Sequence, residues 1–121
     1  MSTLEQYTRS VIVEDLVRTA NIEVIPLKGA EAAVADLPET TTVTITCSPK
    51  FGLERTLDHV EAAIRSGHRV VPHLAARQVE SEARLVAILD RLNAVGVADL
   101  YVIGGDADEP AGPLLAPTCL H

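Results

Sequence analysis

Strand-like and helix-like segments alternate along this chain, and the alternation limits the possible folds more than any other feature of the sequence. Four short runs rich in Val, Ile and Thr are typical of β-strands. The segments between them repeat apolar residues at helical spacing, and a further helical segment comes first. Such an order predicts an α/β fold of parallel βα units with right-handed crossovers. The expected strands span 22–27, 41–47, 69–75 and 99–105, and the expected helices span 4–20, 29–37, 53–67 and 82–96.

Composition narrows the class of protein. The 121 residues fit one domain, 1–121, and its apolar 47% is mostly aliphatic, which suits parallel strands covered by helices. Acidic residues outnumber basic ones by 17 to 10, and the basic residues form no run, which argues against nucleic acid as a partner. A polar start, without a signal core or an apolar run of membrane-spanning length, predicts a cytoplasmic protein with no membrane association. Cys47 and Cys119 are then expected to be reduced thiols.

Residues able to do chemistry lie within or directly after the expected strands. In parallel α/β folds, ligands bind beyond the carboxyl ends of the strands, where loops and helix starts converge. Each strand here delivers a polar group or a glycine to that rim, which a strand serving only as core would not require. The residues concerned are Glu23, Lys28, Thr46, Cys47, His73, Gly104, Gly105 and Asp106.

Each of these residues also has a purely structural interpretation. Glu23 lies in an apolar strand, so it is either a lumen-facing acid or the sign of an edge strand. A carboxyl group enclosed by apolar residues retains its proton more readily, which suits a general acid. His73 is either a ligand-facing residue or a core histidine bonded to a backbone carbonyl. Thr46 fits a strand by propensity alone, and Asp106 after two glycines fits a turn cap.

No metal or Rossmann nucleotide site is expected. The stretch "DADEP" begins like a calcium loop, but Glu109 and Pro110 stand where a ligand and a glycine should follow. His68 and His73 are five residues apart, a spacing that puts them on opposite faces of a strand and disfavours zinc. The glycine pair Gly104-Gly105 belongs to no G-x-G-x-x-G pattern after the first strand.

Taken together, four short motifs resemble the methylenetetrahydrofolate reductase family in the order of its strands. "IEVIPLK" matches the end of that family's first strand, and "ITCS" followed by Arg55-Thr56 matches its second. Pro72-His73-Leu74 matches the third, and "GGDADEPAGP" takes the place of the fourth. The resemblance covers nearly the whole chain but only the first half of the family's barrel. It therefore implies half of a TIM (β/α)8 barrel, with four strands and an N-terminal helix.

The resemblance also implies a reaction, in which NAD(P)H reduces 5,10-methylenetetrahydrofolate to 5-methyltetrahydrofolate, with FAD as the usual hydride carrier. Glu23 would be the general acid that protonates a folate nitrogen and opens its five-membered ring. Asp106 would be a carboxylate between cofactor and pterin. The expected cofactor-binding residues are Thr46, His73, Ile103, Gly104, Gly105 and Asp106.

Two departures from the family pattern keep alternatives open. Gly104 stands where the family has an arginine, and the chain holds only one Phe and two Tyr, so ring stacking for a flavin is sparse. Direct transfer of hydride from nicotinamide to folate is then the alternative to a flavin-dependent route. A second class of function is a non-catalytic chain, either a truncated fragment or a partner subunit that keeps the scaffold and a folate- or flavin-like pocket.

A half-barrel leaves its inner face open. We expect this face to carry the apolar side chains that a complete barrel buries, forming a patch large enough to drive association. Two copies facing one another would approximate an eight-stranded barrel, so the sequence predicts a homo-oligomer, most simply a dimer.

Overall fold

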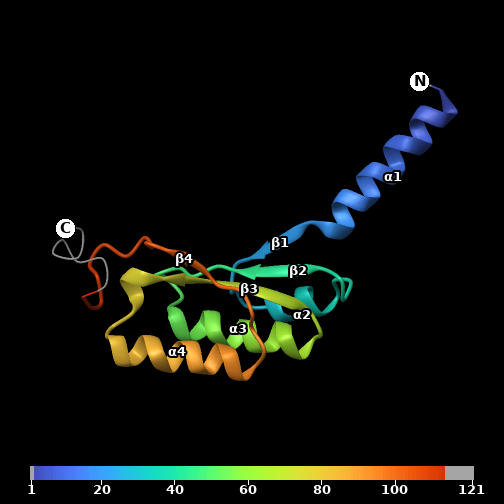
Figure 1. Ribbon diagram of the computed structural model, residues 1–121. Coiled ribbons are helices and arrows are strands. Elements are labelled where there is room, and N and C mark those ends of the chain that lie inside the picture. Colours follow the sequence, from blue (N-terminus) through green and yellow to red (C-terminus); the bar gives the residue numbers. More distant parts are fainter. Residues whose placement is uncertain (1, 114–121) are drawn as a thin grey trace.

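The computed structural model describes residues 2–113 and shows one parallel sheet with helices (Figure 1). Its strands are β1 (Asn21–Val24), β2 (Thr42–Ile45), β3 (Arg69–Ala75) and β4 (Tyr101–Ile103). Its helices are α1 (Thr3–Thr19), α2 (Ala30–Ala35), α3 (Leu53–Arg65) and α4 (Glu82–Ala94), with a 3-10 turn at Ala76–Gln78. The strands lie in sequence order and all pair in parallel. The predicted α/β fold with four parallel strands and an N-terminal helix is confirmed.

Helices α2, α3 and α4 cover one face of the sheet and form the core with it (Figure 1). Every second residue of β2 and β3 points to this side, and Val43, Ile45 and Val70 are buried there. Each buried aliphatic side chain of this size stabilises the fold by about 1.5–3 kcal/mol. From the helices, Val60 and Ile88 are fully enclosed. The core therefore lies on one side of the sheet only.

A capping residue sets the start of α4, and ion pairs hold this helix against α3. Ser81 caps α4 as expected, because its hydroxyl accepts a hydrogen bond of 3.1 Å from the backbone N–H of Arg84. Along the outer surface, the guanidinium of Arg91 pairs with carboxylates of α3, and Arg84 joins one of them. These acidic partners are Glu54, Asp58 and Glu61. The ion pairs tie the two helices together on the side away from the sheet.

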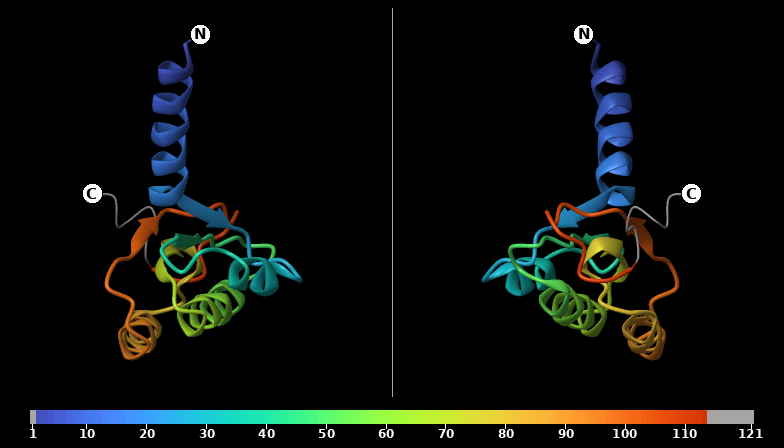
Figure 2. Two further views of the ribbon diagram at one scale, coloured as in Figure 1. Left: turned by 90° about the vertical axis from the view of Figure 1, so that its right-hand side faces the viewer. Right: turned by 90° about the vertical axis from the view of Figure 1, so that its left-hand side faces the viewer.

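The other face of the sheet is not covered by α2, α3 or α4 (Figure 2). Alternation along the strands places Glu23, Thr44 and His73 on this side, opposite to the buried positions of the same strands. Asn21 and Tyr101 join them at the two edges of the sheet. The expectation of an apolar inner face is therefore wrong, because the residues that alternate with the buried aliphatic ones are mostly polar.

Exposed apolar side chains gather instead on α1, which leaves β1 and extends away from the sheet (Figures 1 and 2). This helix begins with a capping box, in which Ser2 and Glu5 bond to each other's backbone N–H. No residue of α1 is buried, although it carries large apolar side chains on several sides. The exposed members are Leu4, Tyr7, Val11, Ile12, Val13, Leu16 and Val17.

Two further expectations concern the reduced state of the cysteines and the lack of a membrane-spanning segment. Cys47 is buried and forms no disulfide with any described residue, whereas Cys119 lies outside the described residues. Within residues 2–113, no helix combines the length and the apolar character needed to cross a bilayer.

Candidate functional site

A hollow of about 390 Å³ lies on the open face of the sheet, and every strand contributes to its lining. Glu23 of β1 is level with Thr44 of β2, which is level with Val71 of β3. One step further, His73 is paired in register with Tyr101 of β4. Because parallel neighbours lie about 4.8 Å apart, these side chains form one continuous surface. Asn21 completes the lining at the amino end of β1.

Side chains in this hollow are free to bind a ligand. His73 and Tyr101 contact each other, with ring centroids 5.3 Å apart and planes inclined by 35°. Neither ring, nor the carboxylate of Glu23, makes a side-chain hydrogen bond to another described residue. His73 is half-buried and does not bond to a backbone carbonyl, so the interpretation as a satisfied core histidine does not hold within residues 2–113. The hollow thus offers an acid, a hydroxyl, an imidazole and a phenol side by side.

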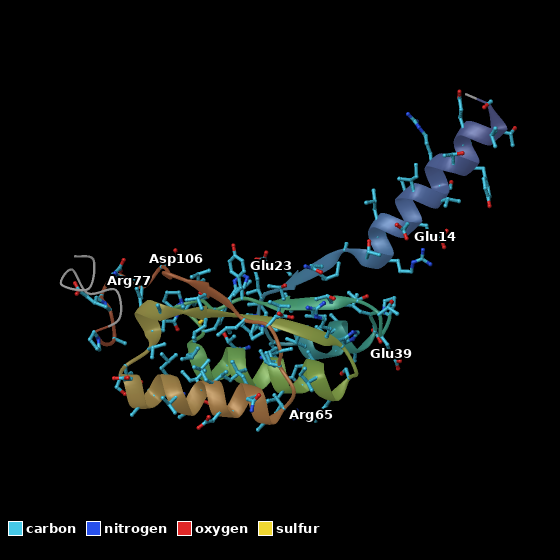
Figure 3. All side chains as sticks on the ribbon, viewed as in Figure 1. Glu14, Glu23, Glu39, Arg65, Arg77 and Asp106 are labelled. Atoms are coloured by element: carbon cyan, nitrogen blue, oxygen red, sulfur yellow. The ribbon has the colours of Figure 1, made fainter. Side chains whose placement is uncertain are left out.

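Glu23 does not lie in the apolar enclosure expected from the sequence. Its side chain is exposed and points away from the helices, on the open side of the sheet (Figure 3). Val24 and Ile25, the apolar neighbours on which the expectation depended, do not line the hollow. For Val24 the correction follows from alternation, since residues adjacent along a strand point to opposite faces, whereas Ile25 lies beyond the end of β1. The described residues therefore leave this carboxyl unenclosed.

Asp106 lies in the loop beyond β4, on the same side of the sheet as Glu23 but nearer the carboxyl edge (Figure 3). It is exposed and does not line the hollow. The structure therefore places the two predicted catalytic carboxylates on one side of the molecule without bringing them into one pocket. A ligand that contacts both has to extend from the hollow to the rim.

The Asp106 loop is held by Arg77, which sequence reasoning missed. The guanidinium of Arg77 donates 2.7 Å and 2.9 Å hydrogen bonds to the carbonyls of Ala107 and Asp108. Its backbone N–H donates to Gly104, and its carbonyl accepts from the N–H of Ala111. These four bonds fix the loop from Gly104 to Ala111 against the 3-10 turn. The only sequence signal was a basic residue directly after the third strand.

Gly105 allows the loop to approach β3 closely. Its φ is +98°, in the left-handed region that favours glycine. A Cβ at this position would lie 3.0 Å from the Cβ of Ala75. Gly104 and Gly105 thus bring the chain back over the end of β3, and Ile103 pairs in register with Ala75 just before them. For all three residues the structure shows a role in shaping the loop.

Thr46 directly follows β2 and contributes its backbone to the fold. Its N–H donates a 3.0 Å hydrogen bond to the carbonyl of Val24, and its carbonyl accepts one of 3.0 Å from the hydroxyl of Thr56. It is half-buried and does not line the hollow. Thr44, two residues earlier, takes the place in the hollow that was expected for Thr46. The alternation "TTVTITC" already contained that signal, because Thr44 and Thr46 share one face.

Metal-ligand geometry is not found among residues 2–113, where no three His, Cys, Asp or Glu side chains are grouped to hold an ion. His68 comes just before β3 and is buried, with its Nε2 2.8 Å from the carbonyl of Val34. That contact makes His68 a link between the α3–β3 turn and α2.

No family model matches the chain.

Proposed function

We propose that this chain carries part of a methylenetetrahydrofolate reductase-like site, in which Glu23 serves as the proton donor. The observation that supports the proposal most is the hollow itself, where Glu23, Thr44, His73 and Tyr101 meet on the open face. A carboxyl group held at a fixed position is one of the side chains that can protonate a reacting nitrogen as a general acid. The resemblance of the strand-end motifs provides the reaction to which this carboxyl belongs.

In the proposed reaction, Glu23 transfers its proton to the folate nitrogen whose bond to the bridging carbon breaks. The five-membered ring opens to an iminium, and hydride from a reduced nicotinamide completes the methyl group. Thr44 provides a hydroxyl beside the acid, and the paired rings of His73 and Tyr101 provide a surface for a flat heterocycle. Asp106 contacts the part of the ligand that reaches the rim.

The side chains suit one flat ring better than a flavin dinucleotide. A hollow of about 390 Å³ is of the size that accepts a pterin or nicotinamide ring. The described residues offer one aromatic pair there, and Phe51 lies elsewhere, against Lys50 and Arg55. We therefore favour direct hydride transfer from NAD(P)H and assign no step to FAD.

Catalysis at Glu23 requires a cover over the open face. An exposed carboxyl gives up its proton to water well below neutral pH, whereas an enclosed one retains it. We propose that a second copy of the chain provides this cover, so that two open faces enclose the ligand between them. The dimer is then part of the catalytic proposal.

Glu23→Gln is the direct test, because it keeps the shape and polarity of the side chain while removing the proton. We expect turnover of methylenetetrahydrofolate to fall about a hundredfold or more, with ligand binding retained. Glu39→Gln is the matched control, since Glu39 is also exposed but lies away from the hollow (Figure 3). Full turnover by Glu23→Gln would reject the assignment of the acid.

Exposure of Glu23 favours one alternative, a non-catalytic partner subunit that keeps the scaffold and the pocket. The two functions are separated by comparing binding with turnover. A chain that binds reduced folate, yet shows no turnover with both nicotinamides and flavin supplied, would fit the partner subunit. Turnover that depends on Glu23 would fit the enzyme.

A further inference from the structure

A second hollow, of about 380 Å³, lies on the helix side of the sheet, beyond the carboxyl end of β1. The loop after β1, the start of α2 and the first turns of α3 form its walls. It shares no residue with the hollow on the open face. Its lining combines Leu27, Gly29 and Ala32 with the charged side chains of Lys28, Arg55 and Glu31 and the nearly buried His59.

Arg55 is fixed in place with its outer nitrogen atoms free. Its Nε donates to the carbonyl of Pro26, and its guanidinium carbon lies 5.4 Å from the centre of the Phe51 ring. Neither Nη atom is bonded to an acceptor within residues 2–113. A guanidinium held by one nitrogen and one ring face has little conformational freedom left to lose, so its remaining donors are prepared for a ligand.

Lysines add to the positive charge at this place. The chain contains only two lysines, Lys28 and Lys50. Lys28 lines the same hollow, and the Nζ of Lys50 is 5.5 Å from the centre of the same Phe51 ring. Neither lysine forms an ion pair with any described residue, whereas most arginines of the structure are paired or hydrogen-bonded.

Few acidic side chains offset the positive charge of this second hollow. Glu31 is the only carboxylate in the lining, and it lies 4.0 Å from Nε2 of His59. In the lining, the two cations Lys28 and Arg55 face this one carboxylate, and Lys50 adds positive charge outside the lining, at the Phe51 ring, on a chain whose net charge is −7. Like charges held together without counterions repel one another, and an anion placed among them would relieve that repulsion.

We propose that Lys28, Arg55 and Lys50 form a binding site for a phosphate group. A phosphate has up to two negative charges and several acceptor oxygens, which match the free Nη donors of Arg55 and the two ammonium groups. The phosphate belongs either to a nucleotide or to a small inorganic anion. The proposal is independent of the catalytic role of Glu23.

Titration of the whole chain with inorganic pyrophosphate at constant ionic strength tests the site. Two-dimensional NMR spectra should show saturable shifts at the backbone amides of Gly29, Phe51 and Arg55. Lys28→Gln, an exposed substitution that leaves the core intact, should weaken binding about tenfold. Arg65→Gln is the matched control, because Arg65 is an exposed, unpaired cation near the far end of α3 (Figure 3).

Comparisons between variants and between anions decide the outcome. Glu31→Gln should tighten pyrophosphate binding severalfold, because it removes the only carboxylate from the lining. Tighter binding of adenosine diphosphate than of pyrophosphate would identify a nucleotide as the source of the phosphate, and equal binding would identify an inorganic anion. Absence of saturation, equal weakening by Arg65→Gln, or citrate binding as tight as pyrophosphate would each overturn the proposal.

Discussion

Replacing Gly105 by alanine measures how closely the Asp106 loop packs against β3. The φ of +98° costs a residue with a side chain about 1–2 kcal/mol. The new Cβ would lie 3.0 Å from the Cβ of Ala75 and 3.8 Å from that of Arg77, so the surroundings must shift. Overpacking of this kind costs about 1–3 kcal/mol. We therefore expect Gly105→Ala to lower the free energy of unfolding by about 2–5 kcal/mol.

Gly96→Ala is the control that separates the two contributions. Its φ of +91° is nearly the same, but no atom lies within 4 Å of the position of a Cβ there. It should lose only about 1–2 kcal/mol in urea unfolding followed by circular dichroism. Amide exchange of residues 104–111 completes the assay, because detachment of the loop from Arg77 would speed exchange there instead of destabilising the whole fold. Equal unfolding losses for both variants, with unchanged exchange in the loop, would refute the close approach.

Three further predictions concern the loop, the helix pair and association. Arg77→Ala removes two hydrogen bonds to loop carbonyls, so amide exchange in residues 104–111 should accelerate while the core amides stay protected; uniform acceleration would contradict this. Hydrogen bonds from Arg91, and to a smaller extent from Arg84, hold the pKa of Glu54 below its ordinary value. The ionised carboxylate therefore stabilises the fold above the ordinary pKa, and this contribution is lost as the pH falls through the lowered pKa. Glu54→Gln should therefore make the free energy of unfolding fall less steeply as the pH is lowered into the acid range. At neutral pH the variant should lose less than about 1 kcal/mol, because the ion pairs are exposed. An unchanged dependence on acid pH would argue against the network. With reduced folate at saturation, light scattering should give twice the chain mass of 12.9 kDa, and Tyr101→Glu on the open face should restore the monomer; an unmodified chain that stays monomeric at micromolar concentration under these conditions would reject the dimer.

The order and type of the elements could be predicted because strand-like and helix-like segments differ in how their apolar residues are spaced along the sequence. The third strand has the predicted bounds of Arg69–Ala75, and the cap at Ser81 lies where α4 begins. The first strand ends at Val24, earlier than expected, because the chain turns where the N–H of Leu27 bonds to the carbonyl of Ile25 and Pro26 has no N–H to offer. Strand ends depend on such local turns, which strand propensity does not describe.

Which candidate residues share one face could be predicted from their positions along the strands, whereas the surroundings of each residue could not. Glu23 and His73 do share one hollow, because both point to the open side of the sheet, from β1 and β3 on either side of β2. The apolar character expected around Glu23 came from its sequence neighbours, of which Val24 points to the other face and Ile25 lies beyond the end of β1. The role of Arg77 could not be predicted, because its partners come about thirty residues later in the chain.

A polar open face has a consequence for how the proposed dimer forms. Burying hydroxyl, amide and ring groups without partners costs about 1–3 kcal/mol for each group, so two empty polar faces gain little by meeting. A ligand that fills the hollow supplies those partners and adds its own flat surface to the contact. Association through the open face should therefore be coupled to ligand binding, and the dimer should tighten as reduced folate is added. Coupling of this kind would also place Glu23 in an enclosed environment only when substrate is present, which is when a proton donor is needed.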